Sequence, residues 1–147
     1  MTLGFLAALA TLVLGPAAPA QAVKPVNQSF FGVAIEGHDP VAYHRDGRPT
    51  KGSQDHVHEW MGAKWRFASA ENRDRFAADP ERYAPAYGGY CAYAVSKGTT
   101  AGIDPQAWRI VDGRLYLNLS PAVQALWEQD IPRHVRQADE NWPRLRD

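Results

Sequence analysis

Cysteine is almost absent from this chain: of 147 residues, one carries a thiol, Cys91. A single cysteine cannot form a disulfide within the chain, so packing must hold the fold together. An excess of one charge is also lacking, because 16 basic and 16 acidic residues give a formal net charge of zero. A chain without excess positive charge has little attraction for a phosphate backbone, so we expect no nucleic-acid partner.

No hydrophobic run is long enough to span a bilayer. The longest, LGFLAALATLVLG, has about a dozen residues, where a membrane-spanning helix needs roughly 20. Small residues and prolines follow it, and Ala20-Gln21-Ala22 has the small-x-small pattern of a signal peptidase site. We therefore expect residues 1–22 to be a signal peptide, with Val23 starting a periplasmic or secreted protein that keeps no integral membrane segment.

The apolar run lacks one feature of a signal peptide, since no Lys or Arg precedes it. Either the start of the protein lies upstream, or the signal is atypical. Residues 23–147 show no repeat and no low-complexity tract, and their number fits one domain with one core.

Alternating apolar residues predict two β-hairpins. HVHEWMGAKWRF, residues 56–67, pairs His58 with Trp65 if Met61-Gly62 forms the turn. One face then carries His56, His58, Trp60, Trp65 and Phe67. WRIVDGRLYLNL, residues 108–119, contains Asp112-Gly113, a preferred dipeptide of type I′ turns.

Capping residues predict the helices. Ser69 precedes a helix over about 70–78 that Asp79-Pro80 ends, and a short helical turn follows through Tyr83. Ser120-Pro121 and Pro132 begin two further helices. In FGVAIEGHDPVAY, residues 31–43, we expect two extended pieces around a turn, and in residues 44–55 a surface loop. Hairpins with segregated helices indicate the α+β class.

Several motifs, in order, resemble a YHS domain. They are Asp39-Pro40-Val41, His58-Glu59-Trp60, Trp65 to Ser69, and Phe76 to Tyr83. The likeness to exported, stand-alone YHS-domain proteins is closer still, because it includes GGYCAYAV, IVDGRLYLN and a terminal NWP, and it covers about residues 32–143. The resemblance implies a treble-clef-like module related to heavy-metal-associated proteins, in which cysteines near the DPV and F-C-S-x-x-C positions bind the ion.

Those cysteines are missing from this chain. Ala42 stands at the first position, Ala68 and Asn72 stand at the later pair, and of the tripeptide that names the family only His58 survives. A metal function therefore needs other ligands. Cys91 with His58 and His56 offers a thiolate and imidazoles, which suit a copper or zinc ion.

The segment YGGYCAYAV, residues 87–95, is the second candidate for a site. We expect it to form a wall of the main pocket, with Tyr87, Tyr90 and Tyr93 as ligand-contacting side chains and Cys91 directed inward toward His58. Packing explains the same residues: a lone cysteine behaves as a small buried hydrophobe, and His58 opposite Trp65 suits a stacked core histidine. His38, His44 and His134 are expected in solvent.

Two hypotheses follow for function. The first is a non-enzymatic exported protein that binds or handles a soft metal ion, copper or zinc, through a non-standard site. The second is a metal-free module that binds a small ligand or another exported protein. No residue pattern indicates catalysis, because a Cys-His pair needs an activated thiolate and an oriented base.

Export yields a direct prediction. Mass spectrometry of the protein from its native cell should give an N-terminus at Val23, because Ala20-Gln21-Ala22 is the best cleavage pattern after the apolar run. An intact Met1 on soluble cytoplasmic protein would contradict it.

Overall fold

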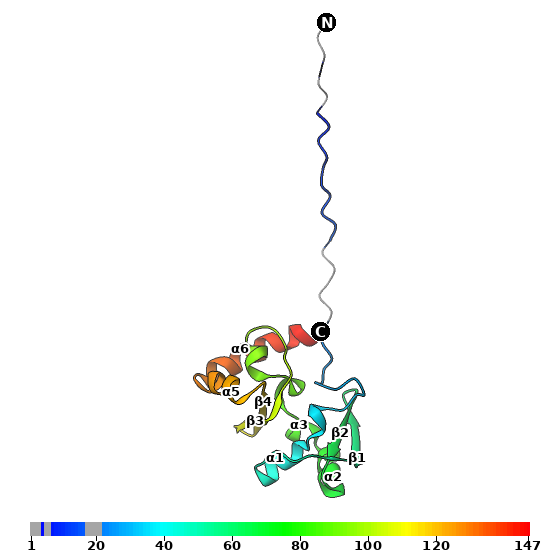
Figure 1. Cartoon of the computed structure of the whole chain (residues 1–147), viewed down its shortest axis with the longest axis vertical. Coiled ribbons are helices and arrows are strands. Elements are labelled where there is room, and N and C mark those ends of the chain that lie inside the picture. Colours follow the sequence, from blue (N-terminus) through cyan, green and yellow to red (C-terminus); the bar gives the residue numbers. More distant parts are fainter. Residues whose placement is uncertain (1–3, 5–6, 17–21) are drawn as a thin grey trace.

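The computed structural model describes residue 4, residues 7–16 and residues 22–147. Ala20 and Gln21 of the expected cleavage site lie outside the described residues. Within the described part of the chain, no helix has the length and apolar character needed to cross a membrane. From residue 22 onward the chain folds into two adjoining halves (Figure 1).

The first half is a hairpin covered by short helices. Strands β1 (Ser53–Trp60) and β2 (Ala63–Phe67) pair antiparallel, and η1 (Ile35–Gly37), α1 (Pro40–Asp46), α2 (Ala70–Ala78) and α3 (Pro80–Tyr83) surround them. The predicted register is confirmed, with His58 opposite Trp65 and Trp60 opposite Ala63. Met61 takes φ 53°, the left-handed region that favours glycine, so this turn is held in a conformation that a side chain rarely adopts.

The second half is also a hairpin surrounded by short helices. Strands β3 (Asp104–Val111) and β4 (Arg114–Asn118) pair across the predicted Asp112-Gly113 turn. Around them lie η2 (Ala86–Gly89), α4 (Ala92–Ser96), α5 (Pro121–Glu128) and α6 (Ile131–Arg146). The predicted caps at Ser69 and Ser120 are confirmed, and the fold is α+β as expected.

Residues 40–46 correct one prediction, because they form helix α1 where we expected an extended piece. The Asp39 side chain accepts hydrogen bonds from the backbone N–H groups of Val41 and Ala42, and Pro40 stands at the first helical position. This capping outweighs the β-favouring Val41. The predicted surface loop is correspondingly shorter, since α1 extends to Asp46 and β1 begins at Ser53.

The Asp39 carboxylate joins three segments of the first half. Its Oδ1 accepts from Val41 N at 2.8 Å and from Ala42 N at 3.1 Å. Its Oδ2 accepts from Ala68 N at 2.9 Å and from Asn72 Nδ2 at 2.8 Å. Asp39 is 0% exposed. A buried carboxylate needs such donors to offset its lost hydration, so the start of α1, the end of β2 and helix α2 are held at one point.

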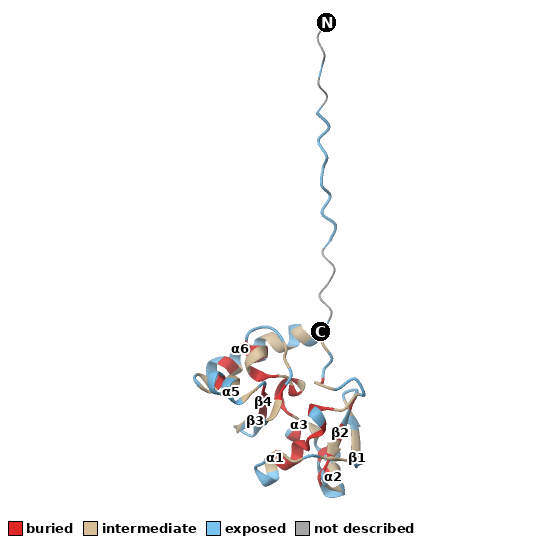
Figure 2. Cartoon of the chain, in the orientation of Figure 1, coloured by how far each residue is buried: buried red, intermediate tan, exposed pale blue. Residues whose placement is uncertain are grey.

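The buried side chains form two clusters (Figure 2). One surrounds Trp65, Phe67 and Phe76 and reaches Leu115 and Leu117 of β4, so it joins the two halves. The other gathers Tyr87, Tyr116 and Trp127 with apolar residues of α4 and α6. Tyr43 adds a polar link, because its hydroxyl donates to Pro105 O at 2.8 Å.

Replacing Asp39 tests its joining role. Asp39→Ala should lower the free energy of unfolding by about 3 to 5 kcal/mol, because several buried N–H donors lose their acceptor at once. Ser69→Ala is the matched control: it removes one bond, from Asn72 N at 3.1 Å, and should cost about 1 kcal/mol. Urea denaturation measures both, and equal losses would contradict the joining role.

Candidate functional site

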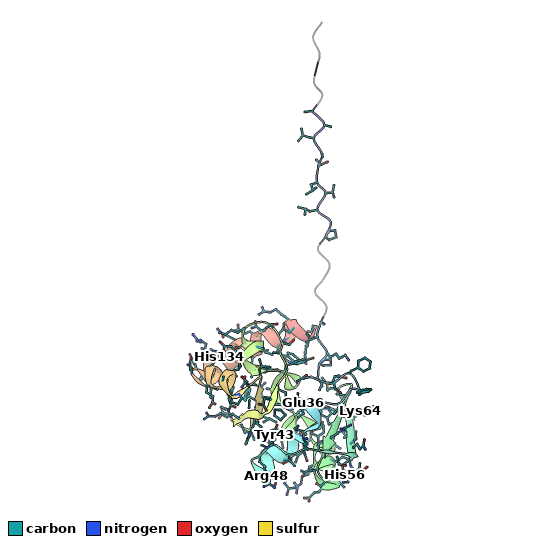
Figure 3. All side chains as sticks on the ribbon, in the orientation of Figure 1. Glu36, Tyr43, Arg48, His56, Lys64 and His134 are labelled. Carbon is teal, nitrogen blue, oxygen red and sulfur yellow. The ribbon has the colours of Figure 1, made fainter. Side chains whose placement is uncertain are left out.

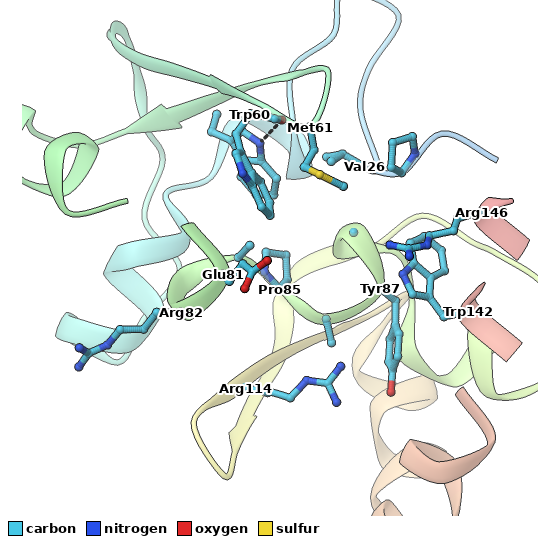
Figure 4. Close-up of a pocket in the computed structure, with 15 residues that line it drawn as sticks. Val26, Trp60, Met61, Glu81, Arg82, Pro85, Tyr87, Arg114, Trp142 and Arg146 are labelled. Carbon is cyan, nitrogen blue, oxygen red and sulfur yellow. Dashed lines mark hydrogen bonds between the residues drawn. The ribbon is translucent and has the colours of Figure 1, made fainter. Parts of the chain in front are cut away.

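A cavity of about 330 Å³ opens where the two halves meet (Figure 4). Its lining comes from residues 25–26, from Trp60 and Met61 at the β1–β2 turn, from residues 84–88, from Arg114 on β4, and from Trp142 and Arg146 on α6. The volume lies at the small end of the range for ligand sites in proteins. The cavity is therefore the candidate functional site.

Aromatic packing places the first wall. The ring of Trp60 lies 5.9 Å from that of Trp65 and 5.7 Å from that of Phe76. Trp65 Nε1 donates to Trp60 O at 3.1 Å, the bond drawn in Figure 4. Met61, 42% exposed, follows at the turn and its side chain points into the same space. The wall is thus an indole with a flexible thioether at its rim.

Tyr87 and Trp142 make the opposite wall. Their rings lie 6.3 Å apart and nearly perpendicular, and the Tyr87 hydroxyl donates to Asp139 Oδ1 at 3.0 Å. Burial raises the pKa of Tyr87, and the adjacent negative charge of Asp139 raises it further. The phenol therefore stays neutral and acts as a fixed, apolar surface with its polar tip already bonded.

Two guanidinium groups border this wall. Arg114 lies over the rings of Tyr87 and Tyr116, 5.5 Å and 5.3 Å from their centroids, and its Nη1 contacts Asp139 Oδ1 at 3.3 Å. Arg146 lies beside Trp142 (Figure 4). Glu81 is on the α3 side, whereas Arg82 points away from the cavity.

Gly88 lets the chain close this part of the cavity. It takes φ 61°, and a Cβ there would lie 2.0 Å from Pro25 O. Asn27 N donates to Gly88 O at 2.9 Å, and Asn27 Nδ2 donates to Gly89 O at 3.0 Å. The residues after the expected cleavage site therefore pack directly on the Gly88-Gly89 backbone.

The predicted wall YGGYCAYAV is found only at its first residues. Tyr87 and Gly88 line the cavity, whereas the ring of Tyr90 packs on Trp142 at 5.8 Å and that of Tyr93 packs on His134 at 5.3 Å. Neither Tyr90 nor Tyr93 lines the cavity. Helix α4 begins at Ala92, so the segment turns away from the opening after Gly89.

Cys91 does not line the cavity either, and its sulfur contacts Asn118 and Leu119 where we expected it to be directed toward His58. It is 1% exposed, and its Sγ lies 3.3 Å from Leu119 N and 3.6 Å from Asn118 Oδ1. Asn118 Oδ1 also accepts from Tyr93 N at 3.0 Å, at the first turn of α4. The thiol thus packs between α4 and the end of β4.

The structure does not gather the predicted metal ligands Cys91, His58 and His56 into one cluster. The ring of His58 packs on Phe76 at 6.1 Å, and His56 lies at the outer end of the first half (Figure 3). Over residues 4, 7–16 and 22–147, no three His, Cys, Asp or Glu side chains form a group able to hold a metal ion.

Two histidines correct the expectation of solvent exposure. His134 is 3% exposed and its Nδ1 lies 2.8 Å from Trp127 O, and His38 is also buried. Helical periodicity places His134 on the face of α6 that contacts α4. The polarity of a histidine considered by itself does not reveal that burial. Burial lowers the pKa of His38.

The positions at which the resemblance expects cysteines do come together. Ala42, Ala68 and Asn72 each donate a hydrogen bond to the Asp39 carboxylate. Ala42 and Ala68 donate through their backbone N–H groups and have no side-chain ligand atom, and Asn72 turns its N–H donor toward this point, whereas a cation needs electron-pair donors. The residues present therefore do not fit the family's thiolate-bound ion.

A comparison with protein-family models matches residues 41–87 to the YHS domain. The chain therefore contains a YHS domain, which corresponds to α1, the first hairpin, α2, α3 and the start of η2. The match is consistent with a metal-related role. Searches of curated proteins and of solved structures gave no match.

The cavity includes residues that sequence reasoning missed, above all Arg114, Trp142 and Arg146. Arg114 directly follows the predicted Asp112-Gly113 turn, which fixes its place in the hairpin but not its neighbours. Trp142 and Arg146 lie on α6, which follows from the predicted helix at Pro132, but no local pattern signals that these two side chains line a cavity.

Gly88→Ala tests how the cavity is closed. The new Cβ would meet the Pro25 carbonyl, so we expect a loss of about 2 to 4 kcal/mol in the free energy of unfolding and a change in tryptophan fluorescence from the displaced wall. Gly62→Ala is the control, since it also has positive φ but meets nothing within 4 Å, and it should cost about 1 kcal/mol. Identical losses would contradict the steric explanation.

Proposed function

We propose that this protein is a non-enzymatic, exported binding module whose ligand site is the cavity between Trp60 and Trp142. One observation carries the proposal: a preformed space of about 330 Å³ has aromatic walls and a few polar groups at its border. This combination is typical of small-molecule sites. The first half of the chain supplies the wall with Trp60, and the second half supplies the wall with Trp142.

The proposal makes ligand binding independent of metal. The Cys91 thiol is deeply buried and already contacts Leu119 N and Asn118 Oδ1. Cys91 is therefore assigned to packing.

The second candidate is binding of a soft ion, copper or zinc, through Cys91 with His58 and His56. The YHS match favours it, because the family resemblance is to metal-associated modules. It requires the β1 histidines and the α4 thiol to converge, and hence a rearrangement of both halves.

Binding of an uncharged aromatic probe tests the first candidate. Indole added to the untagged mature protein should shift the NMR signals of the Trp60 and Trp142 indole N–H groups and of the Gly88 amide, because these residues line the cavity. The shifts should be the same after treatment with a chelator. Shifts confined to other parts of the protein would refute the assignment of the site.

Cys91→Ser separates the two candidates in the same preparation. It should leave indole binding and any Cu(I) or Zn(II) affinity unchanged and lower the free energy of unfolding by about 1 to 3 kcal/mol, as expected for a disturbed core group. Tight Cu(I) binding that this variant and His58→Ala both abolish would establish the metal site instead.

A further inference from the structure

We propose that the natural ligand of the cavity is a small aromatic anion, such as a carboxylate attached to a ring. This inference rests on the proposed function and names the chemical class of the ligand. Two independent features of the lining carry it: the aromatic side chains of both walls, and the sign of the charges at the border.

The aromatic part of the ligand follows from the facing walls. Trp60 lies on one side and Trp142 lies on the other, and Tyr87, which is 3% exposed, packs against Trp142 at the same border (Figure 4). A flat ring between such walls can stack on one and meet another edge-on, the two arrangements that aromatic pairs prefer. The small volume limits the ligand to one or two rings.

The anionic part follows from Arg114. Its guanidinium is held by the Tyr87 and Tyr116 rings and by Asp139, so its orientation is set before a ligand arrives. An arginine has five N–H donors in a fixed fork, and the contact from Nη1 to Asp139 leaves others for a carboxylate. Little side-chain entropy is then lost on binding.

The charged residues that line the cavity are mainly basic, although Arg114 and Arg146 each also pair with a carboxylate outside the lining, Asp139 and Asp147. Arg146 adds a second guanidinium beside Trp142, whereas Glu81 is the acidic side chain that lines the cavity. Glu81 stands on the α3 side, so the positive end of the site is the side of β4 and α6. A ligand that places its ring between the tryptophans reaches that end with its carboxylate.

Three probes with one ring and different charge test the proposal by calorimetry on the full mature chain. Indole-3-acetate should bind about tenfold tighter than indole-3-acetamide, the effect of one charge-assisted hydrogen bond. The cation tryptamine should bind more weakly than the amide. The advantage of the acetate should shrink in 0.5 M salt, because both arginines are partly exposed.

Charge variants identify the groups responsible. R114Q and R146Q should each reduce the acetate's advantage over the amide to about threefold or less, whereas E81Q should increase it. R133Q is the matched control, since Arg133 is on α6 but outside the cavity, paired with Asp130. If R114Q unfolds the protein, R146Q still tests the preference for an anion, because the Arg146 side chain is exposed and its loss should not disturb the fold.

The outcomes distinguish the two levels of the proposal. Equal binding of acetate, amide and amine, or a preference for tryptamine, would overturn the anionic ligand and leave the cavity as the binding site. Failure of all three probes and of indole to bind would overturn both. If R133Q lowers the preference for the acetate as much as R146Q does, the preference depends on the net charge of the protein and not on the cavity. That result would also overturn the assigned site.

Discussion

The first half depends on one buried carboxylate. Asp39 is excluded from water, and its two oxygens together accept four hydrogen bonds, from the first turn of α1, from Ala68 after β2 and from the Asn72 side chain. Each bond alone is ordinary, but together they fix the hairpin between two helices. β1 and β2 pair from Ser53 and Phe67 to their turn, with one irregularity between Ser53 and Val57, so Asp39 holds the end of the hairpin opposite to Trp60 and Met61.

This arrangement explains how a YHS domain keeps its shape without the thiolates that the resemblance leads one to expect. A bound cation joins chain segments by attracting lone pairs, whereas Asp39 joins similar segments by attracting N–H groups. Ala42 and Ala68 donate through the backbone and would do so whatever their side chains, so Asn72 is the position of the three whose side chain serves the carboxylate. Its amide donates at 2.8 Å where a cysteine would offer a sulfur.

Local chemistry made much of this fold predictable. The Met61-Gly62 and Asp112-Gly113 turns set both registers, and Ser69 and Ser120 set two helix starts, because each signal acts within a few residues. The failures share another cause. Asp39 was read as part of a turn, His134 as exposed, and Arg114 was not considered. The capping of α1 by Asp39 is local, but its bonds to Ala68 and Asn72 span 29 and 33 residues. The contacts of Arg114 with Tyr87 and Asp139 are also distant in sequence, and those of His134 come from a whole helix face, so sequence spacing does not contain them.

Asp139 shows how the cavity combines rigidity with charge. Its Oδ1 accepts from the Tyr87 hydroxyl and contacts Arg114, so one carboxylate fixes both an aromatic wall and the guanidinium in front of it. The same contact partly cancels the positive charge of Arg114. Without Asp139 the arginine would attract an anion more strongly, but its side chain would be less ordered. In a chain of zero net charge, long-range attraction cannot select a ligand, so selection falls to short, oriented contacts. An arginine held in one orientation suits that task better than a free one, because less side-chain entropy is lost when a ligand binds.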